Sequence, residues 1–306
     1  MAIIRKRSKL DSKVVVLSIL TYLLIFSGCN PVESARSKSE SHKIDSLIQL
    51  QKVNDKTVLV RFGYDAITAI KTTKGIVIVD AGISTSLTNR YKRLIEKEFN
   101  QKNFIYVINT HGHHDHIRGN SIFPHAQIIG HKNWKNDATE MENTDSTLKR
   151  IGRIVKEYDQ QLQRINPDTH EWEDNFTQKI RYSNAYLDIS KNIPFKLPDI
   201  TFPDSLNLNC GDVTFEMLFF GRFHSNSDIL IYAPEIRTLF VGDLFSKYGR
   251  PGMNKSLIPD ADRWIHALQW ISSRTNNIVT IIDGHGQILS TDDVKLFTDN
   301  LTSKLR

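Results

Sequence analysis

Cysteine is almost absent from this chain of 306 residues, which contains only Cys29 and Cys210. Cys29 falls in an N-terminal segment that we expect to be processed, so Cys210 has no partner within the fold and an internal disulfide is excluded. The 15 glycines and 9 prolines follow no period, which excludes collagen-like and low-complexity proteins. The content of 40% hydrophobic and 24% charged residues is ordinary for a globular protein and argues against a disordered chain.

A strong excess of one charge is also missing once the N-terminus is set aside. The formal net charge is +6, but the first 28 residues hold five basic residues and one acidic residue, which leaves +2 for the rest. A balance this small does not indicate a polyanionic partner. We therefore expect no nucleic acid among the partners.

The N-terminus lacks an apolar run of the roughly 20 residues that a membrane-spanning helix needs. Residues 14–26 are apolar apart from Ser18 and Thr21, and they follow a basic stretch. This order predicts a signal peptide over residues 1–28. The small residues before Cys29 resemble the lipobox of bacterial lipoproteins, in which the cysteine becomes the lipidated N-terminus, although Phe26 stands where Leu is usual. A buried N-terminal helix with an incidental cysteine is the alternative.

These features predict a protein exported to the bacterial cell envelope and anchored to the membrane as a lipoprotein through Cys29. Residues 29–51 are polar and rich in Ser and Lys. We expect them to tether the membrane anchor to a domain over residues 52–306.

The rest of the chain alternates short β-rich runs with amphipathic segments. Strands are predicted over residues 57–62, 66–71, 75–79, 103–109, 127–130, 213–219, 229–232, 238–241 and 277–282. Helices are predicted over residues 87–99 and 262–272 and at the C-terminus. Residues 132–195 are polar, with almost no glycine or proline, and predict an inserted helical segment that contains a long helix and covers one side of the site. A plain surface excursion is the alternative reading of the insertion.

The end of the strand over residues 103–109 carries the most informative cluster in the chain. His111, His113, Asp115 and His116 lie within six residues, and each would need a partner if it were buried. A metal ion supplies such a partner, and imidazole with carboxylate suits zinc or another first-row cation. In an extended chain the side chains of His111, His113 and Asp115 would point to one side. His116 would need a local bend to join them, and Gly112 and Gly119 provide room for such a bend.

Three later residues follow predicted strands in the same way: His224, Asp243 and His285. Each is a weak signal alone, because a polar residue after a strand often belongs only to a turn. Together with the first cluster they resemble the metallo-β-lactamase superfamily, and the Asp80-Ala81-Gly82 segment resembles an early motif of that family. The resemblance implies an α+β fold, a four-layer αβ/βα sandwich with the metals at one edge and the helical insertion added to it.

The resemblance also implies roles for the individual residues. His111, His113 and His224 would hold one Zn²⁺, and Asp115, His116 and His285 would hold a second, with Asp243 bridging the two. Asp115 would also be the catalytic residue, and Asp80 and Asp228 would orient the imidazoles. Two zinc ions, two carboxylates and a bridging hydroxide leave a net charge of +1, which suits stabilisation of a developing oxyanion.

The activity that this resemblance implies is metal-dependent hydrolysis of a small-molecule ester, thioester, lactone or amide. Cleavage of β-lactams is the alternative, although the best-known β-lactamase subclass has Cys at the position of Asp243 and Lys at that of Ser246. Ser246 also stands where acyl-homoserine lactonases have Tyr. Hydroxyacylglutathione hydrolases carry a C-terminal helical region that the 21 residues after His285 cannot form. A metal-stabilised binding protein without catalysis is the third possibility.

Overall fold

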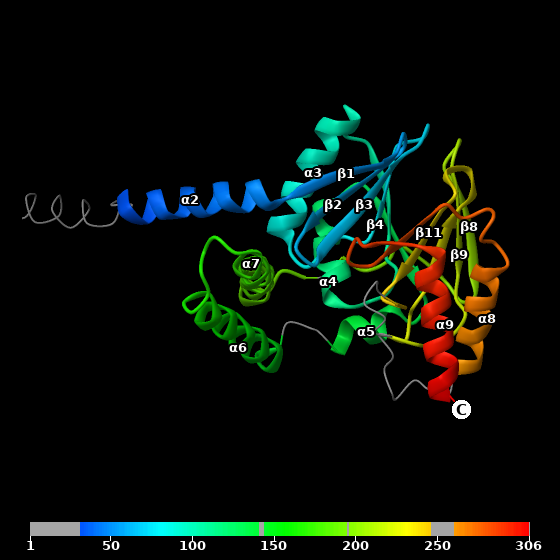
Figure 1. Ribbon diagram of the computed structural model, residues 1–306. Helices are drawn as coiled ribbons and strands as arrows, with labels where there is room; N and C mark the ends of the chain where they lie inside the picture. Colours follow the sequence, from blue (N-terminus) through cyan, green and yellow to red (C-terminus); the bar gives the residue numbers. More distant parts are fainter. Residues whose placement is uncertain (1–30, 141–143, 195, 246–259, 306) are drawn as a thin grey trace, which may run out of the picture. The chain divides into compact units, whose positions relative to one another are not determined.

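The computed structural model describes residues 31–140, 144–194, 196–245 and 260–305 (Figure 1). The predicted signal peptide and Cys29 lie outside these residues, as do Ser246 and its neighbours. The chain divides into two compact units, residues 1–46 and 47–306. None of the described helices combines the length and apolar character needed to cross a bilayer.

The segment predicted as a tether contains regular structure. Helix α2 covers Pro31–Leu47, and strand β1 follows at Gln49–Asn54. The strand begins before the predicted domain start at residue 52. Among the described strands it pairs with one neighbour, and the exposure of its side chains does not alternate, so the periodicity that marks a strand in a sequence is missing.

Two mixed sheets form the larger unit. The first contains β1 and β2 (Thr57–Phe62), β3 (Asp65–Lys71), β4 (Ile76–Val79), β5 (Phe104–Ile108), β6 (Gln127–His131) and β7 (Ile200–Phe202), in that spatial order. Neighbours are antiparallel as far as β4 and parallel from β4 to β7. The second contains β13 (Ile288–Leu289), β12 (Thr280–Asp283), β11 (Thr238–Gly242), β10 (Leu230–Ala233), β9 (Thr214–Leu218) and β8 (Ser205–Asn209), and only β11 and β12 are parallel.

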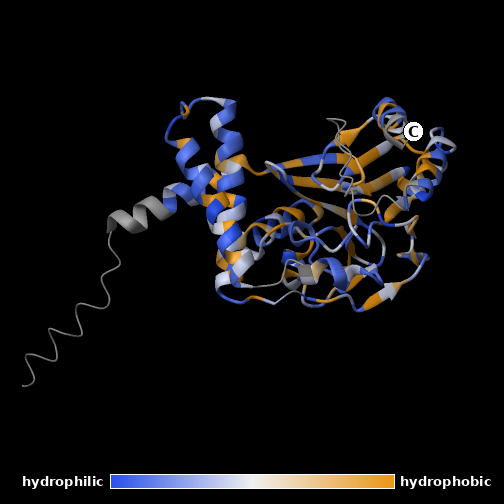
Figure 2. Cartoon of the chain, turned by 90° about the horizontal axis from the view of Figure 1, so that it is seen from below, coloured by the Kyte–Doolittle hydropathy of each residue, from blue (hydrophilic) through white to orange (hydrophobic). Residues whose placement is uncertain are grey.

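The sheets face each other across a hydrophobic core. Leu59 and Val77 of the first sheet belong to the same buried cluster as Phe215, Ile231 and Phe240 of the second, together with the buried Cys210. Figure 2 shows the strands largely in hydrophobic colours, whereas the helices carry many hydrophilic residues. Burial of apolar surface stabilises a folded protein by about 25 cal/mol per Å², so this cluster holds the two sheets together.

Helices cover the outer faces of the two sheets. Helix α3 (Thr85–Phe99) packs on β2 and β3 and buries Leu87, Tyr91 and Ile95. Its ends are fixed by Ser84, which accepts a hydrogen bond from the Leu87 N–H, and by Asn100 in the left-handed conformation. On the other side, α8 (Ala261–Ser272) and α9 (Thr291–Leu305) share a buried cluster with β10 and β11. The α+β sandwich implied by the resemblance is therefore confirmed.

The insertion connects two parallel neighbours of the first sheet, β6 and β7, which need a crossover connection. It contains α5 (Trp134–Glu140), α6 (Asp145–Leu162) and α7 (His170–Ser190), where the sequence predicted one long helix. Thr144 and Thr169 cap the N-termini of α6 and α7, and the helices pack against each other. The remaining short helices are α4 (His114–Ile117), η1 (Arg118–Ile122) and η2 (Pro234–Ile236).

Candidate metal centre

The residues predicted as metal ligands converge on one edge of the sandwich, where strands of both sheets end. The first sheet contributes a segment that follows β5, and the second contributes residues that follow β9, β11 and β12. Three overlapping groups have ligand atoms within 4.8 Å of one another: His111 with His113 and His224; His111 with His116 and Asp243; Asp115 with His116 and His285.

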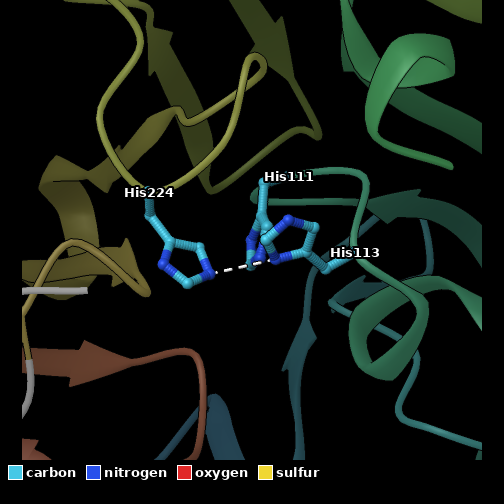
Figure 3. A group of neighbouring side chains, drawn as sticks. All are labelled: His111, His113 and His224. Atoms are coloured by element: carbon cyan, nitrogen blue, oxygen red, sulfur yellow. Dashed lines mark hydrogen bonds between the residues drawn. The ribbon is translucent and has the colours of Figure 1, made fainter. Parts of the chain in front are cut away.

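The first group is drawn in Figure 3, where the three imidazoles point toward one another from two separate segments. His224 Nε2 lies 3.0 Å from His113 Nδ1. Asp243 connects this group to the other two, because its Oδ2 lies 3.5 Å from His224 Nε2, 3.6 Å from His116 Nε2 and 3.2 Å from His285 Nε2. Asp243 thus occupies the central position that bridging two ions requires.

Hydrogen bonds at the Nδ1 atoms determine which nitrogen of three rings faces the centre. His285 Nδ1 lies 2.7 Å from the Tyr64 carbonyl oxygen, and His116 Nδ1 lies 3.0 Å from Asp80 Oδ2. Both oxygens can only accept, so each Nδ1 carries the proton. His111 Nδ1 lies 3.1 Å from the Thr110 hydroxyl, which itself donates to Asp80. In each neutral ring the lone pair therefore lies on Nε2, the atom that faces the centre and can bind a cation.

The donor set fits a metal on a second, independent ground. His111 Nε2, His116 Nε2 and Asp243 Oδ1 are buried, and none of them has a hydrogen-bond partner among the described residues. Buried polar atoms without a partner cost free energy, roughly 1–3 kcal/mol each. A cation held by imidazole nitrogens and carboxylate oxygens would satisfy all three atoms.

Without a metal ion, protons on the histidines supply the positive charge that balances the carboxylates of the centre. Burial alone would lower the pKa of His285, but Asp243 raises it to about 9. Burial would also lower the pKa of His116. The nearby carboxylates of Asp243, Asp80 and Asp115 outweigh burial and raise this pKa well above its ordinary value. The pKa of Asp243 is held well below its ordinary value because His285 and His116 outweigh burial. Divalent ions would replace these protons.

Asp80 connects the first sheet to the centre. Its carboxylate accepts from the Thr110 N–H and hydroxyl, both at 2.8 Å, and from His116 Nδ1. Asp80 follows β4 with φ of +57°, a left-handed conformation that Asp and Asn tolerate better than other side chains. It therefore orients His116 directly and His111 through Thr110.

Asp228 acts on the loop that carries His224. Its buried carboxylate accepts from the main-chain N–H groups of Phe223 and Ser225 and from the Ser225 hydroxyl, at 2.7–2.9 Å. These contacts fix the backbone on both sides of His224.

The backbone around Asp115 differs from the extended chain that the sequence predicted. His113 is the last extended residue, and α4 begins immediately after it. A helical turn rotates successive side chains by about 100°, so Asp115 and His116 reach the centre from neighbouring directions. Gly119 allows this turn to lie close to the end of β4, because a Cβ there would lie 1.9 Å from the Ala81 carbonyl oxygen.

Two residues of the insertion that were not predicted from the sequence support the centre. Arg181 on α7 is buried, and its Nη2 lies 3.8 Å from Asp115 Oδ2. Asp137 on α5 is also buried and accepts hydrogen bonds from the Ser227 hydroxyl and from the main-chain N–H of Asn226. Ser227 in turn accepts from the Gly112 N–H, so Asp137 holds both histidine-bearing loops. No local sequence pattern distinguished either residue.

Comparison with known proteins agrees with this geometry. The family model described as "Metallo-beta-lactamase superfamily" matches residues 61–285. A metallo-beta-lactamase type 2 of Bacillus cereus is 24% identical over 262 residues, which cover 84% of this chain and 82% of that protein. A protein of the same name from a Bacillus sp. is equally similar, at 24% identity over 262 residues.

Two solved structures share the fold. A metallo-beta-lactamase from Pontibacter korlensis superposes with a TM-score of 0.51 at 16% identity, covering 83% of this chain and 99% of the other. A stereoselective inverting sec-alkylsulfatase from Pseudomonas sp. superposes with a TM-score of 0.59 at 16% identity, covering 83% of this chain and 41% of the other.

Proposed function

The chain belongs to the metallo-β-lactamase superfamily, and from this membership and the geometry of its site we propose that it is a dinuclear zinc hydrolase. Homologues in this superfamily are metal-dependent hydrolases, and a His/Asp centre that can hold metal is present here. The observation that carries the proposal is the set of three overlapping ligand groups with Asp243 near histidines of all three, because one ion would leave part of the set unused. The substrate is a small molecule with a carbonyl ester, thioester, lactone or amide.

Zinc ions, when bound, would lower the pKa of a water molecule that they hold and would polarise the carbonyl group of a substrate. The protein supplies the orientation of the centre. Asp80 and the Tyr64 carbonyl hold the Nδ1 protons of His116 and His285, so Nε2 of each ring is the atom that would bind a metal ion. Asp115 is the proposed catalytic residue: burial would raise its pKa, but His116, His114 and His285 hold it well below its ordinary value. Asp115 is thus a carboxylate that can orient a water molecule by accepting its proton in a hydrogen bond.

Cleavage of β-lactams is the second candidate. The two Bacillus relatives named as metallo-beta-lactamases support it, at 24% identity. Asp243 argues against it, because the best-known β-lactamase subclass has Cys there. A binding protein that uses the metal only for stability is the third and least supported candidate.

Metal content and a substrate panel test these candidates together. We expect about two zinc ions per purified chain by mass spectrometry, hydrolysis of an alkyl ester, a thioester or a lactone, and loss of the second ion and of turnover in Asp115→Ala. Asp159→Ala, which removes a carboxylate of α6 paired with Lys179, is the control and retains both. Turnover of nitrocefin would favour the β-lactamase. Fewer than one ion after reconstitution would refute the dinuclear centre.

We further propose that the chain is exported and anchored through a lipid on Cys29. The order of basic, apolar and small residues before Cys29 supports this location. We expect labelled palmitate to be incorporated into the wild-type chain in a bacterial host and not into Cys29→Ser. An intact N-terminus in the purified protein would contradict the proposal.

A further inference from the structure

A cavity of about 530 Å³ lies between helices α6 and α7 and the turn that joins β2 to β3. Its volume is in the range of small-molecule sites, about 300–1,000 Å³. Tyr158 comes from α6, Tyr182 from α7 and Tyr64 from the turn, so the insertion builds most of the wall. None of the roles described above uses this cavity.

The cavity adjoins the metal centre at two points. Tyr64 lines it, and the Tyr64 carbonyl oxygen accepts from His285 Nδ1 at 2.7 Å, with the two rings edge to face at 6.4 Å. Gln178 also lines it and accepts from Arg181 Nη1 at 2.8 Å, and Arg181 approaches Asp115 from the other side. The cavity wall is therefore one contact away from His285, through Tyr64, and two contacts away from Asp115, through Gln178 and Arg181.

The wall offers flat aromatic faces together with unused hydrogen-bonding groups. The rings of Tyr158 and Tyr182 are nearly parallel, at 13°, with centroids 6.2 Å apart. Among the described residues, nothing forms a hydrogen bond with the hydroxyls of the three tyrosines or with the side-chain amide of Gln161. Each phenol and amide can both donate and accept, which suits a ligand rich in hydroxyl groups.

The charges of the wall select against an anionic ligand. Among the residues that the structure describes, no lysine or arginine lines the cavity, so an anionic group finds no cationic partner in its wall. The two carboxylates at the rim, Glu157 and Asp174, already lie 3.7 Å from Arg153 Nε and 3.4 Å from His170 Nδ1. Both carboxylates are more than half exposed and can accept hydrogen bonds from hydroxyl groups.

From these features we propose that the cavity binds a neutral saccharide unit, and that the hydrolysed ester is carried on this saccharide. Aromatic faces pack on the C–H face of a sugar ring, while phenol and amide groups bond its hydroxyls. The assignment of the saccharide as part of the substrate rests on the proposed hydrolase function. Binding in the cavity does not.

The first experiment measures binding alone, by saturation-transfer NMR with the methyl glycosides of glucose, galactose, mannose and N-acetylglucosamine and the full chain. We expect transfer to at least one glycoside, and its loss in Tyr158→Ala and in Gln161→Ala, whose exposed side chain is dispensable for folding. Tyr186→Ala removes an exposed tyrosine of α7 that does not line the cavity, and it retains binding. Absence of transfer in the wild type, retention in both cavity variants, or binding of tetramethylammonium alone would overturn the proposal.

The second experiment compares kcat/KM for the monoacetylated glycosides with kcat/KM for ethyl acetate, an alkyl ester without a sugar. We expect the glycoside esters to be preferred at least tenfold, and the ratio to fall at least tenfold in Tyr158→Ala but not in Tyr186→Ala. Hydrolysis without preference refutes the substrate assignment and leaves the hydrolase standing. Saccharide binding without hydrolysis of either kind of ester refutes the substrate assignment and leaves the saccharide site standing.

Discussion

Replacing Asp80 by Asn is the sharpest test of how the centre is organised. The substitution keeps the shape of the side chain and its tolerance of the left-handed φ of +57°. The carboxylate accepts three hydrogen bonds, two from Thr110 and one from His116. An amide has one accepting oxygen, so its NH₂ group must face at least one of these donors.

The expected consequence is a reversed tautomer at His116. If the Asn NH₂ group faces Nδ1, the neutral ring accepts there and carries its proton on Nε2, which then cannot bind a cation. Loss of a partner that orients a metal-binding histidine lowers metal affinity about 10- to 100-fold. That ratio corresponds to roughly 1.4–2.7 kcal/mol. The group formed by His111, His116 and Asp243 would be affected first.

The assay is competition for zinc with a chromophoric chelator, combined with chemical unfolding of the metal-free protein. Asp188→Asn is the matched control, because this buried carboxylate also accepts from the N–H and hydroxyl of a threonine, Thr85, but bonds no histidine. We expect both variants to lose about 1–3 kcal/mol of stability. Only Asp80→Asn should lose zinc affinity. Equal zinc affinity in Asp80→Asn and the wild type would refute the orienting role.

Three further outcomes follow from the structure. Arg181→Met should lower the free energy of unfolding by about 3–5 kcal/mol, because it leaves buried carboxylates such as Asp65 without their cation; a change below 1 kcal/mol in urea unfolding would contradict this. Gly119→Ala should lower the free energy of unfolding by about 1–3 kcal/mol or more, because the new methyl group meets a main-chain oxygen. Gly152→Ala in helix α6 is the control and should be nearly neutral, because the atom nearest to its new methyl group is 3.1 Å away and belongs to a side chain. Finally, the metal-free protein should lose stability as pH rises: the pKa of His285 is about 9 in the folded chain and 6.5 ordinarily, so its contribution is complete below pH 6.5 and lost through pH 9. A melting temperature that stays constant or rises across this window would contradict the assignment.

Much of the sandwich was predictable from local patterns. The strand over residues 57–62 has the same limits in the structure, and the helix predicted at 87–99 begins only two residues earlier. In both segments burial follows from the local spacing of apolar side chains. The spacing of His111, His113, Asp115 and His116 after a strand was informative for the same reason, since the ends of neighbouring strands meet at one edge.

The rest depended on contacts between distant parts of the chain. Arg181 is 66 residues from Asp115, and no local pattern indicates which face of α7 meets the centre. Asp137 likewise acts on Ser227 through a contact that exists only after folding. The helical turn at α4 was missed because four residues with three ionisable side chains show no helical periodicity.

The supply of the candidate ligands by both sheets couples metal binding to the survival of the folded chain. Either sheet alone carries only part of the set, so an ion that uses all of it binds only the chain in which the sheets are docked. A free concentration 1,000 times the Kd then adds about 4.1 kcal/mol to the stability of the folded state. Starvation for the metal would therefore expose the protein to proteolysis, and its abundance would report the metal supply as directly as its activity does.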